Sequence, residues 1–266
     1  MSKISQAEWK IYIKRLSRLS DKAVEEFRNG VISKGGYENI ARQKLIDYAY
    51  AISTKYGEAS ASLSATAYDA VAAVQKAKVA SAVPAEAASY NQVSKTVNGI
   101  IKNTGSEEVL TQSVGLMVKA AGQKTTIMNA VRDKAQIAFI PEGDTCVFCM
   151  TLAANGWHDA SLSDLDKDGE PAHLHANCDC TYGVRFDENL DYAGYHPEEY
   201  EDHYAGIKAT LEEFALPGEK VTSKDVLNYW RREVYAENSE EINAQKRDAY
   251  EKRKERESSA AEEVHL

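Results

Sequence analysis

The residues best suited to chemistry in this chain are its cysteines, which all lie in one segment. Cys146 and Cys149 form a Cys-x-x-Cys pair, and His175, Cys178 and Cys180 follow with the spacing His-x-x-Cys-x-Cys. A Cys-x-x-Cys turn can direct two thiolates onto one ion, and structural zinc sites are closed by four cysteine and histidine ligands. The spacing therefore predicts one structural zinc ion, Zn2+. Five candidate ligands compete for four positions, so one is a bystander or hydrogen-bonds to a ligand.

Other interpretations of the same residues are weaker. Reduced cysteines can pack as small hydrophobic side chains, but two tight pairs are unusual for core filler. Redox chemistry usually needs a strand–motif–helix context that is missing here, and no feature activates a thiol beside His173 or His175. Nucleoside deaminases place a histidine before the cysteines, whereas every histidine here follows Cys149. A metal-dependent endonuclease with His173 as general base is the remaining enzyme alternative.

The loop between the two cysteine pairs contains a partial calcium motif. The stretch DLDKDG, from Asp164 to Gly169, matches the start of a calcium-binding loop, but His175 stands at the twelfth position. Calcium loops have a bidentate glutamate there. We therefore expect an Asp/Gly turn at the surface.

Composition indicates an ordinary globular chain. Its 266 residues are 43% hydrophobic and 27% charged, with a net charge of −9 and a pI of about 5.3. An acidic chain is a poor general coat for nucleic acid, because counterion release needs a field of lysine and arginine. No apolar run is long enough to span a membrane, and the first residues do not resemble a secretion signal. We expect folding in a reducing cytoplasm, where clustered cysteines favour metal binding.

The elements before the cysteines should be helical. One apolar stripe runs from Trp9 to Phe27, and a second from Ala41 to Tyr56 stops at Gly57. An alanine-rich helix suited to close packing should follow, and Pro84 stands where another helix could begin. Ser106 before two glutamates is typical of a helix start, and residues 125–139 should form the last helix of this half.

From Cys146 onward the pattern changes, and this change suggests the domain organisation. TYGVRF at 181–186 has the pattern of a strand, and LDKDGEP that of a turn. A helical segment that becomes increasingly charged follows the break at 216–218. We predict a predominantly helical α+β fold with a helical region (1–138), a small zinc-stapled α+β domain (139–215) and a charged C-terminal helix or tail (216–266).

The cysteine segment resembles one known family. TTIMNAVRDKAQIAFIPEGDTCVFCMTLAANGW followed by HLHANCDCTYGV is similar to the minor head proteins of tailed bacteriophages, the phage Mu F-like (MuF) group. The likeness covers roughly residues 120–190. The matching positions are Cys146, Phe148, Cys149, Leu152, Ala153, Gly156, His175, Cys178 and Cys180.

The resemblance implies a structural role and no catalysis. Such proteins associate in few copies with the portal or the major capsid protein and assist head assembly or DNA delivery. For this chain it implies a place in the virion after synthesis in the bacterial cytoplasm, with no membrane partner and no small-molecule substrate. It leaves room for contact with packaged DNA. The docking surface could be supplied by four tyrosines of the helical half, Tyr48, Tyr56, Tyr68 and Tyr90. The alternative is a zinc-containing nuclease or another nucleic-acid-processing enzyme.

Overall fold

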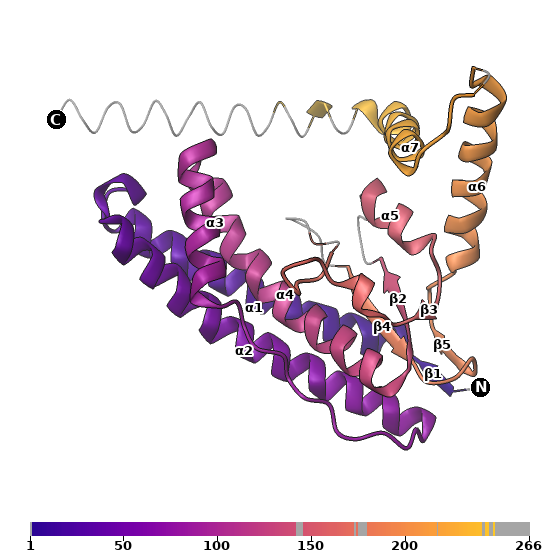
Figure 1. Ribbon diagram of the computed structural model, residues 1–266, viewed down its shortest axis with the longest axis horizontal. Helices are drawn as coiled ribbons and strands as arrows, with labels where there is room; N and C mark the ends of the chain where they lie inside the picture. Colours follow the sequence, from indigo (N-terminus) through magenta and orange to yellow (C-terminus); the bar gives the residue numbers. More distant parts are fainter. Residues whose placement is uncertain are drawn as a thin grey trace. The chain divides into compact units, whose positions relative to one another are not determined.

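A computed structural model describes residues 2–141, 146–172, 174, 180–216, 218–240, 243, 244 and 247. The helices and strands follow one another along the chain as shown in Figure 1. The helices are α1 (Gln6–Ile32), α2 (Arg42–Gln75), α3 (Tyr90–Asn103), α4 (Glu107–Asp133), α5 (Val147–Ala153), α6 (Pro197–Phe214) and α7 (Ser223–Glu237), with short 3-10 turns η1 (Tyr37–Asn39) and η2 (Leu162–Asp164). The strands are β1 (Ser2–Ile4), β2 (Gln136–Ile140), β3 (His158–Asp159), β4 (Thr181–Arg185) and β5 (Leu190–Tyr192). The expected fold class, predominantly helical α+β, is confirmed.

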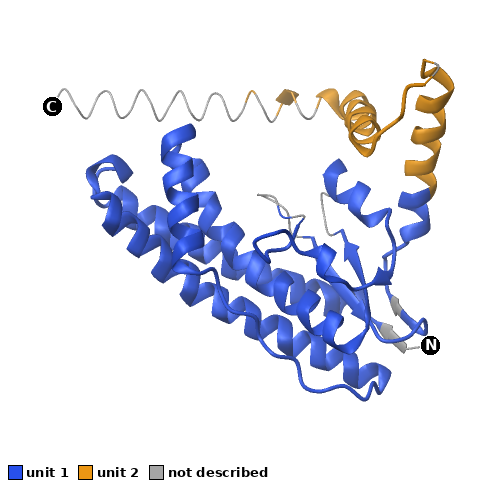
Figure 2. Ribbon diagram, viewed as in Figure 1, with its two compact units in different colours: residues 1–201 blue, residues 202–266 orange. Residues whose placement is uncertain are grey.

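The chain divides into two compact units, residues 1–201 and 202–266 (Figure 2). In the second unit α7 begins at a capping box, because the Thr222 side chain accepts from the backbone N–H of Asp225, whose carboxylate accepts from Thr222 N. Val226 and Trp230 are the buried residues of α7. The helix predicted after residue 218 is therefore present. The division into three domains drawn from the sequence stays a prediction.

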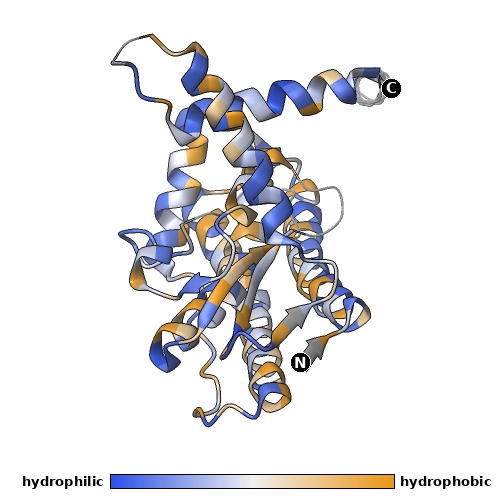
Figure 3. Cartoon of the chain, turned by 90° about the vertical axis from the view of Figure 1, so that its right-hand side faces the viewer, coloured by the Kyte–Doolittle hydropathy of each residue, from blue (hydrophilic) through white to orange (hydrophobic). Residues whose placement is uncertain are grey.

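Four helices of the first unit, α1 to α4, form what we call the helical layer. Figure 1 shows α1, α2 and α4 as long helices that lie side by side. Figure 3 shows hydrophilic and hydrophobic residues mixed along the helices of the chain. Small residues let α4 approach its neighbours closely. A Cβ at Gly122 would lie 2.7 Å from Ser60 Oγ and 2.9 Å from Ser64 Oγ, both on α2. The close packing predicted for the alanine- and serine-rich stretch is therefore present.

Gly57 does not end a helix, and this expectation is wrong. α2 continues through it to Gln75. A Cβ at Gly57 would lie 2.9 Å from the Cβ of Ala87, so this glycine makes room for the chain segment that passes over α2. A glycine within a helix costs only about 1 kcal/mol relative to alanine, which tertiary packing can offset.

The segment that passes over α2, residues 77–89, has no regular secondary structure, so the helix expected from Pro84 is also absent. Side chains bind its backbone directly. Asp69 accepts from Ala82 N at 2.7 Å, and the Asn129 amide accepts from Val83 N and donates to Val83 O, both at 2.9 Å. The next helix, α3, begins only at Tyr90, where Ser89 forms a capping box. Helix propensity is thus overridden by side chains that satisfy the backbone of this irregular segment.

The predicted helix start at Ser106 is confirmed, because its side chain accepts from Val109 N at the first turn of α4. The predicted end is wrong. α4 stops at Asp133, Lys134 adopts a left-handed φ of 54°, and the residues that follow form β2. The run QIAFI can form either structure by periodicity alone, and pairing with β4 decides it.

The strands form a three-stranded antiparallel sheet in the order β3-β2-β4, with Gln136 opposite Arg185 and Ile140 opposite Thr181. The predicted strand at 181–186 is confirmed as β4. A separate parallel pair joins β1 to β5, with Ile4 opposite Tyr192. We call β2, α5, β3, β4 and the described loops between them the cysteine-bearing layer. Among the described residues, no helix is both long and apolar enough to cross a membrane.

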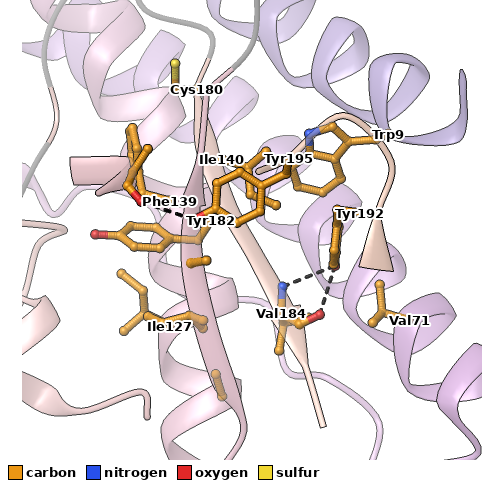
Figure 4. Packing of buried hydrophobic residues seen from close by; sticks show 14 of the residues in the cluster. Trp9, Val71, Ile127, Phe139, Ile140, Cys180, Tyr182, Val184, Tyr192 and Tyr195 are labelled. Carbon is orange, nitrogen blue, oxygen red and sulfur yellow. Dashed lines mark hydrogen bonds between the residues drawn. The ribbon is translucent and has the colours of Figure 1, made fainter. Parts of the chain in front are cut away.

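Two apolar clusters stabilise the first unit. One lies within the helical layer and includes Phe27, Leu45 and Leu110, all at most 1% exposed. The other joins the sheet to the helices, with Trp9 and Ile127 packed beside Tyr182 and Tyr192 (Figure 4). The second cluster also contains Cys149 and Cys180, so the predicted ligands border the main core.

Candidate metal centre

α5 positions the first cysteine pair. Cys146 is the N-cap residue of α5 and is exposed, whereas Cys149, within its first turn, is fully buried. Their sulfur atoms are 3.6 Å apart, which is too long for a disulfide bond of about 2.05 Å. Zn–S bonds of about 2.3 Å at tetrahedral angles place two sulfurs about 3.8 Å apart. The pair therefore has the spacing of two thiolates that share one ion.

The end of α5 is fixed by a glycine and by aromatic side chains. Gly156, with a φ of 58°, donates its N–H to Ala153 O at 3.0 Å. The Tyr195 hydroxyl also donates to Ala153 O, at 3.3 Å, and the Trp157 ring lies 6.0 Å from the Tyr195 ring. The glycine of the motif thus supplies the left-handed residue after the helix. The aromatic residues hold α5 against the sheet.

Cys180 stands directly before β4 and is 5% exposed. Its carbonyl oxygen accepts from Gln123 Nε2 of α4 at 3.2 Å, and Figure 4 shows its sulfur at the edge of the apolar cluster. The structure thus brings Cys149 and Cys180 into one cluster. The other candidate ligands, His175 and Cys178, and the alternative base His173 lie outside the described residues. Within the described part of the chain, no three potential ligands gather around a common point.

The surroundings of Cys180 fit a thiolate–metal centre. The Thr181 hydroxyl and Gln123 Oε1 are buried, and neither finds a hydrogen-bond partner among the residues that the structure describes. Buried polar groups rarely lack partners, and the side chains around metal ligands commonly hydrogen-bond to those ligands. A hydroxyl donor beside Cys180 and an amide oxygen on α4 are suited to a thiolate and to an imidazole N–H, respectively. Sulfur and imidazole ligands are the donor set that zinc prefers.

The loop that connects the cysteine pairs is anchored to the helical layer by a partly buried ion pair. Glu170 Oε1 accepts from Lys124 Nζ at 2.9 Å and from Gln92 Nε2 at 2.8 Å, and both charged side chains are less than a quarter exposed. This anchor ties a turn to α3 and α4 with charge-assisted hydrogen bonds. Sequence inspection did not single out these residues.

The partial calcium motif forms a turn stabilised by its own carboxylates. Asp166 Oδ1 accepts from Asp168 N at 2.8 Å and from Glu170 N at 3.0 Å. Asp164 directs one oxygen to His158 and the other to Ser161 N at 2.9 Å. Carboxylates already used by backbone N–H groups and a histidine do not form a calcium cage.

A histidine–carboxylate pair lies beside a cavity, and sequence inspection missed it. His158 Nε2 is 3.1 Å from Asp164 Oδ1. This hydrogen bond raises the pKa of His158, while partial burial opposes the shift and Asp159 adds a smaller favourable charge. The cavity of about 370 Å³ is lined by Phe139, Leu152, Asn155, His158, Asp164 and Tyr182. Because the two partners belong to different short elements, β3 and η2, only their close approach in the fold reveals them.

The tyrosines expected to form a docking surface differ in exposure. Tyr68 is 1% exposed and belongs to the core, where its hydroxyl donates to Asp133 at 2.9 Å. Tyr90 is 39% exposed, and its hydroxyl donates to Asp47 at 2.7 Å. Tyr48 and Tyr56 are half-buried beside Glu26. Of the four, Tyr90 offers the most accessible ring.

One comparison with known proteins gives a match. A family model described as VG15 protein matches residues 3–207. The matched range contains the helical layer, the cysteine-bearing layer and the start of α6. No curated protein and no solved structure matches the chain.

Proposed function

The chain belongs to the VG15 protein family, and we propose that this phage protein is a minor head protein that docks on the portal or the major capsid protein. In this role it assists head assembly or DNA delivery within the virion. The observation that carries the proposal is the family match across residues 3–207, because it makes the chain a phage protein. The MuF-like positions around α5 and β4 support the assignment to the head.

The proposed metal role is structural. Zinc would be held by four of the candidates Cys146, Cys149, His175, Cys178 and Cys180, and it would crosslink α5 to the start of β4. Four protein ligands close the tetrahedron, so that no position is left to activate water. The 3.6 Å sulfur separation and the buried Thr181 hydroxyl support this arrangement. The chain would then act by docking, not by turnover.

The alternative function, a zinc-containing nuclease, has one structural feature in its favour. His158 and Asp164 form a pair beside a cavity, as a general base and its orienting carboxylate would. However, the described cavity wall contains no lysine or arginine to neutralise a phosphate. Docking is therefore the better supported function.

Co-purification separates the two functions. Tagged protein produced together with the portal and capsid proteins of its phage should be recovered with assembled heads. The same purified protein should leave duplex and single-stranded DNA intact in Mg²⁺ or Mn²⁺. Metal-dependent cleavage that His173→Ala or His158→Ala abolishes, without recovery in heads, would establish the nuclease. Thr151→Ala on α5 is a matched control that leaves every candidate ligand in place.

A further inference from the structure

The outer seam between α1 and α2 contains an apolar hollow. It has a volume of about 290 Å³ and is lined mainly by apolar side chains, among them Ile4, Ile11, Leu63, Val71 and Val74; the charged side chains in its lining are Glu8 and Arg15. Ile11 is 54% exposed and Val74 is 44% exposed. Large apolar side chains that line a hollow and remain open to water commonly mark an interaction site.

Cations follow Ile11 along the same face of α1. The residues three, four, seven and eleven positions after it are Lys14, Arg15, Arg18 and Lys22, and helical geometry places these positions on one side. All four are exposed, and none forms an ion pair with the described part of the chain. Glu8 and Glu25 lie at both ends of this face, and the stretch between them, from Lys14 to Lys22, is a local positive surface in a chain of net charge −9.

A second hollow lies farther along the same seam and is polar. It is lined by Lys22, Glu25, Glu26, Asn29, Gly30, Tyr48 and Tyr56. From Glu8 in the first hollow to Gly30 in the second, α1 rises roughly 30 Å at about 1.5 Å per residue. That is the length of a helix of about 20 residues. The seam thus offers apolar anchorage at one end and polar contacts at the other.

We propose that this seam, which we call the α1–α2 groove, binds an acidic amphipathic helix of a partner protein. The apolar face of such a helix would fill the hollow at Ile11 and Val74, and its carboxylates would face Arg15 and Arg18. Helices recognised in grooves use apolar anchors at three- and four-residue steps. Complementary charge at the rim sets orientation and association rate. Nucleic acid is the poorer occupant, because phosphates gain nothing from an apolar hollow.

This proposal names the kind of partner that the function proposed above would require. It rests on that function in one respect only, which is that the test uses cells producing phage proteins. A photo-crosslinking amino acid at Ile11 is used in cells that also produce the structural proteins of the phage. Val109 on α4, 44% exposed, is the control position. We expect a crosslink from position 11 that is absent from position 109. Mass spectrometry should place it in a net-negative, helix-forming segment of another protein.

Binding of the crosslinked segment, as a synthetic peptide, to the purified full chain completes the test. The double variant Arg15→Glu/Arg18→Glu should weaken binding at least tenfold, and Lys78→Glu/Lys102→Glu, which changes charge elsewhere, less than twofold. A crosslink to DNA, to a second copy of this chain or to a net-positive segment, or none above the control, would overturn the proposal. If the segment belongs to a protein outside the head, the α1–α2 groove is confirmed and the head role is not.

Discussion

The helical layer and the cysteine-bearing layer of the first unit are stabilised in different ways. In the helical layer, glycine and serine let α4 lie so close to α2 that a single added Cβ would collide with Ser60 and Ser64. In the cysteine-bearing layer, short elements are fixed by particular polar contacts, such as Lys124 with Glu170 and His158 with Asp164. The first layer depends on continuous packing and the second on a few directed interactions. Substitutions should therefore destabilise the two layers through different mechanisms.

Removal of a predicted metal ligand should cause the largest loss of stability, and that loss should be confined to the cysteine-bearing layer. Cys149→Ala is expected to remove the zinc, about one ion per chain in the wild type, and to destabilise the cysteine-bearing layer by about 4 kcal/mol or more, because metal binding energy is folding energy. The far-UV helical signal should largely remain. Elemental analysis measures the zinc, and denaturant unfolding followed by intrinsic tryptophan fluorescence, to which Trp157 contributes, measures the loss of stability.

Thr151→Ala is the control, since Thr151 lies on the same helix and its hydroxyl only bonds Phe148 O at 2.7 Å. Equal zinc in Cys149→Ala would identify Cys149 as the candidate that does not bind the ion. Wild-type protein without zinc after dialysis would show that the cysteines are structural thiols. In that case the two layers would differ less than we infer.

A single added methyl group at the α2–α4 contact should lower the stability of the helical layer. Gly122→Ala is expected to destabilise the protein by about 1–3 kcal/mol, because the added Cβ overpacks the α2–α4 contact. Gly99→Ala on α3 is the matched control, since no atom lies within 4 Å of its Cβ position. That change should stabilise the helix by about 0.5–1 kcal/mol. Denaturant unfolding monitored by circular dichroism measures both, and the same sign for both variants would contradict the packing difference.

The same contrast decides what could be predicted from sequence. Apolar periodicity and Ser106 located helices correctly, because those signals are local. The predicted helix end at Gly57 and the predicted helix start at Pro84 were wrong. The conformation of both residues depends on the segment that crosses α2 and is bound by Asn129. The parallel pairing of β1 with β5 joins the two ends of the first unit, and no local pattern specifies it.

For the candidate metal centre, spacing alone identified Cys146 and Cys149 as a pair, and the structure places their sulfurs 3.6 Å apart. Spacing did not reveal the buried hydroxyl of Thr181. It also missed the His158–Asp164 pair, because one partner stood in an apparent calcium motif. Residue types and intervals indicate which ligands are available, whereas the groups that support them come from other elements of the fold.

A directed contact at the sheet edge should have an intermediate effect. The Tyr192 hydroxyl donates to Val184 O at 2.9 Å and accepts from Val184 N at 3.2 Å, which completes the outer edge of β4 (Figure 4). Tyr192→Phe should destabilise the protein by about 1–3 kcal/mol, because both buried backbone groups lose their partner. Tyr37→Phe removes an exposed hydroxyl bond to Gly105 O and should cost less than about 1 kcal/mol. Equal losses in thermal unfolding would show that the edge is satisfied in another way.

The smallest expected effect is a pH dependence that belongs to the cysteine-bearing layer alone. The pKa of His158 is raised in the folded protein, chiefly by its hydrogen bond to Asp164. The pair therefore stabilises the fold fully below the unfolded pKa of about 6.5. This contribution is lost as the pH rises through the higher folded pKa. It should be at most about 1 kcal/mol, because the His158 side chain is 36% exposed and solvent screens the pair.

The difference in unfolding free energy between wild type and His158→Gln isolates this contribution, since protonation of the metal ligands affects both proteins alike. The difference should be largest near pH 5.5 and should shrink toward pH 8.5. Tyr182 stays neutral over this range, because burial raises the pKa of its hydroxyl. His203→Gln, in the second unit, removes a histidine whose Nε2 lies 3.3 Å from Glu233 Oε2 and serves as the comparison. A difference that grows with pH would show that His158 is neutral in the fold, and the cavity beside it would then present a base, as the nuclease alternative requires.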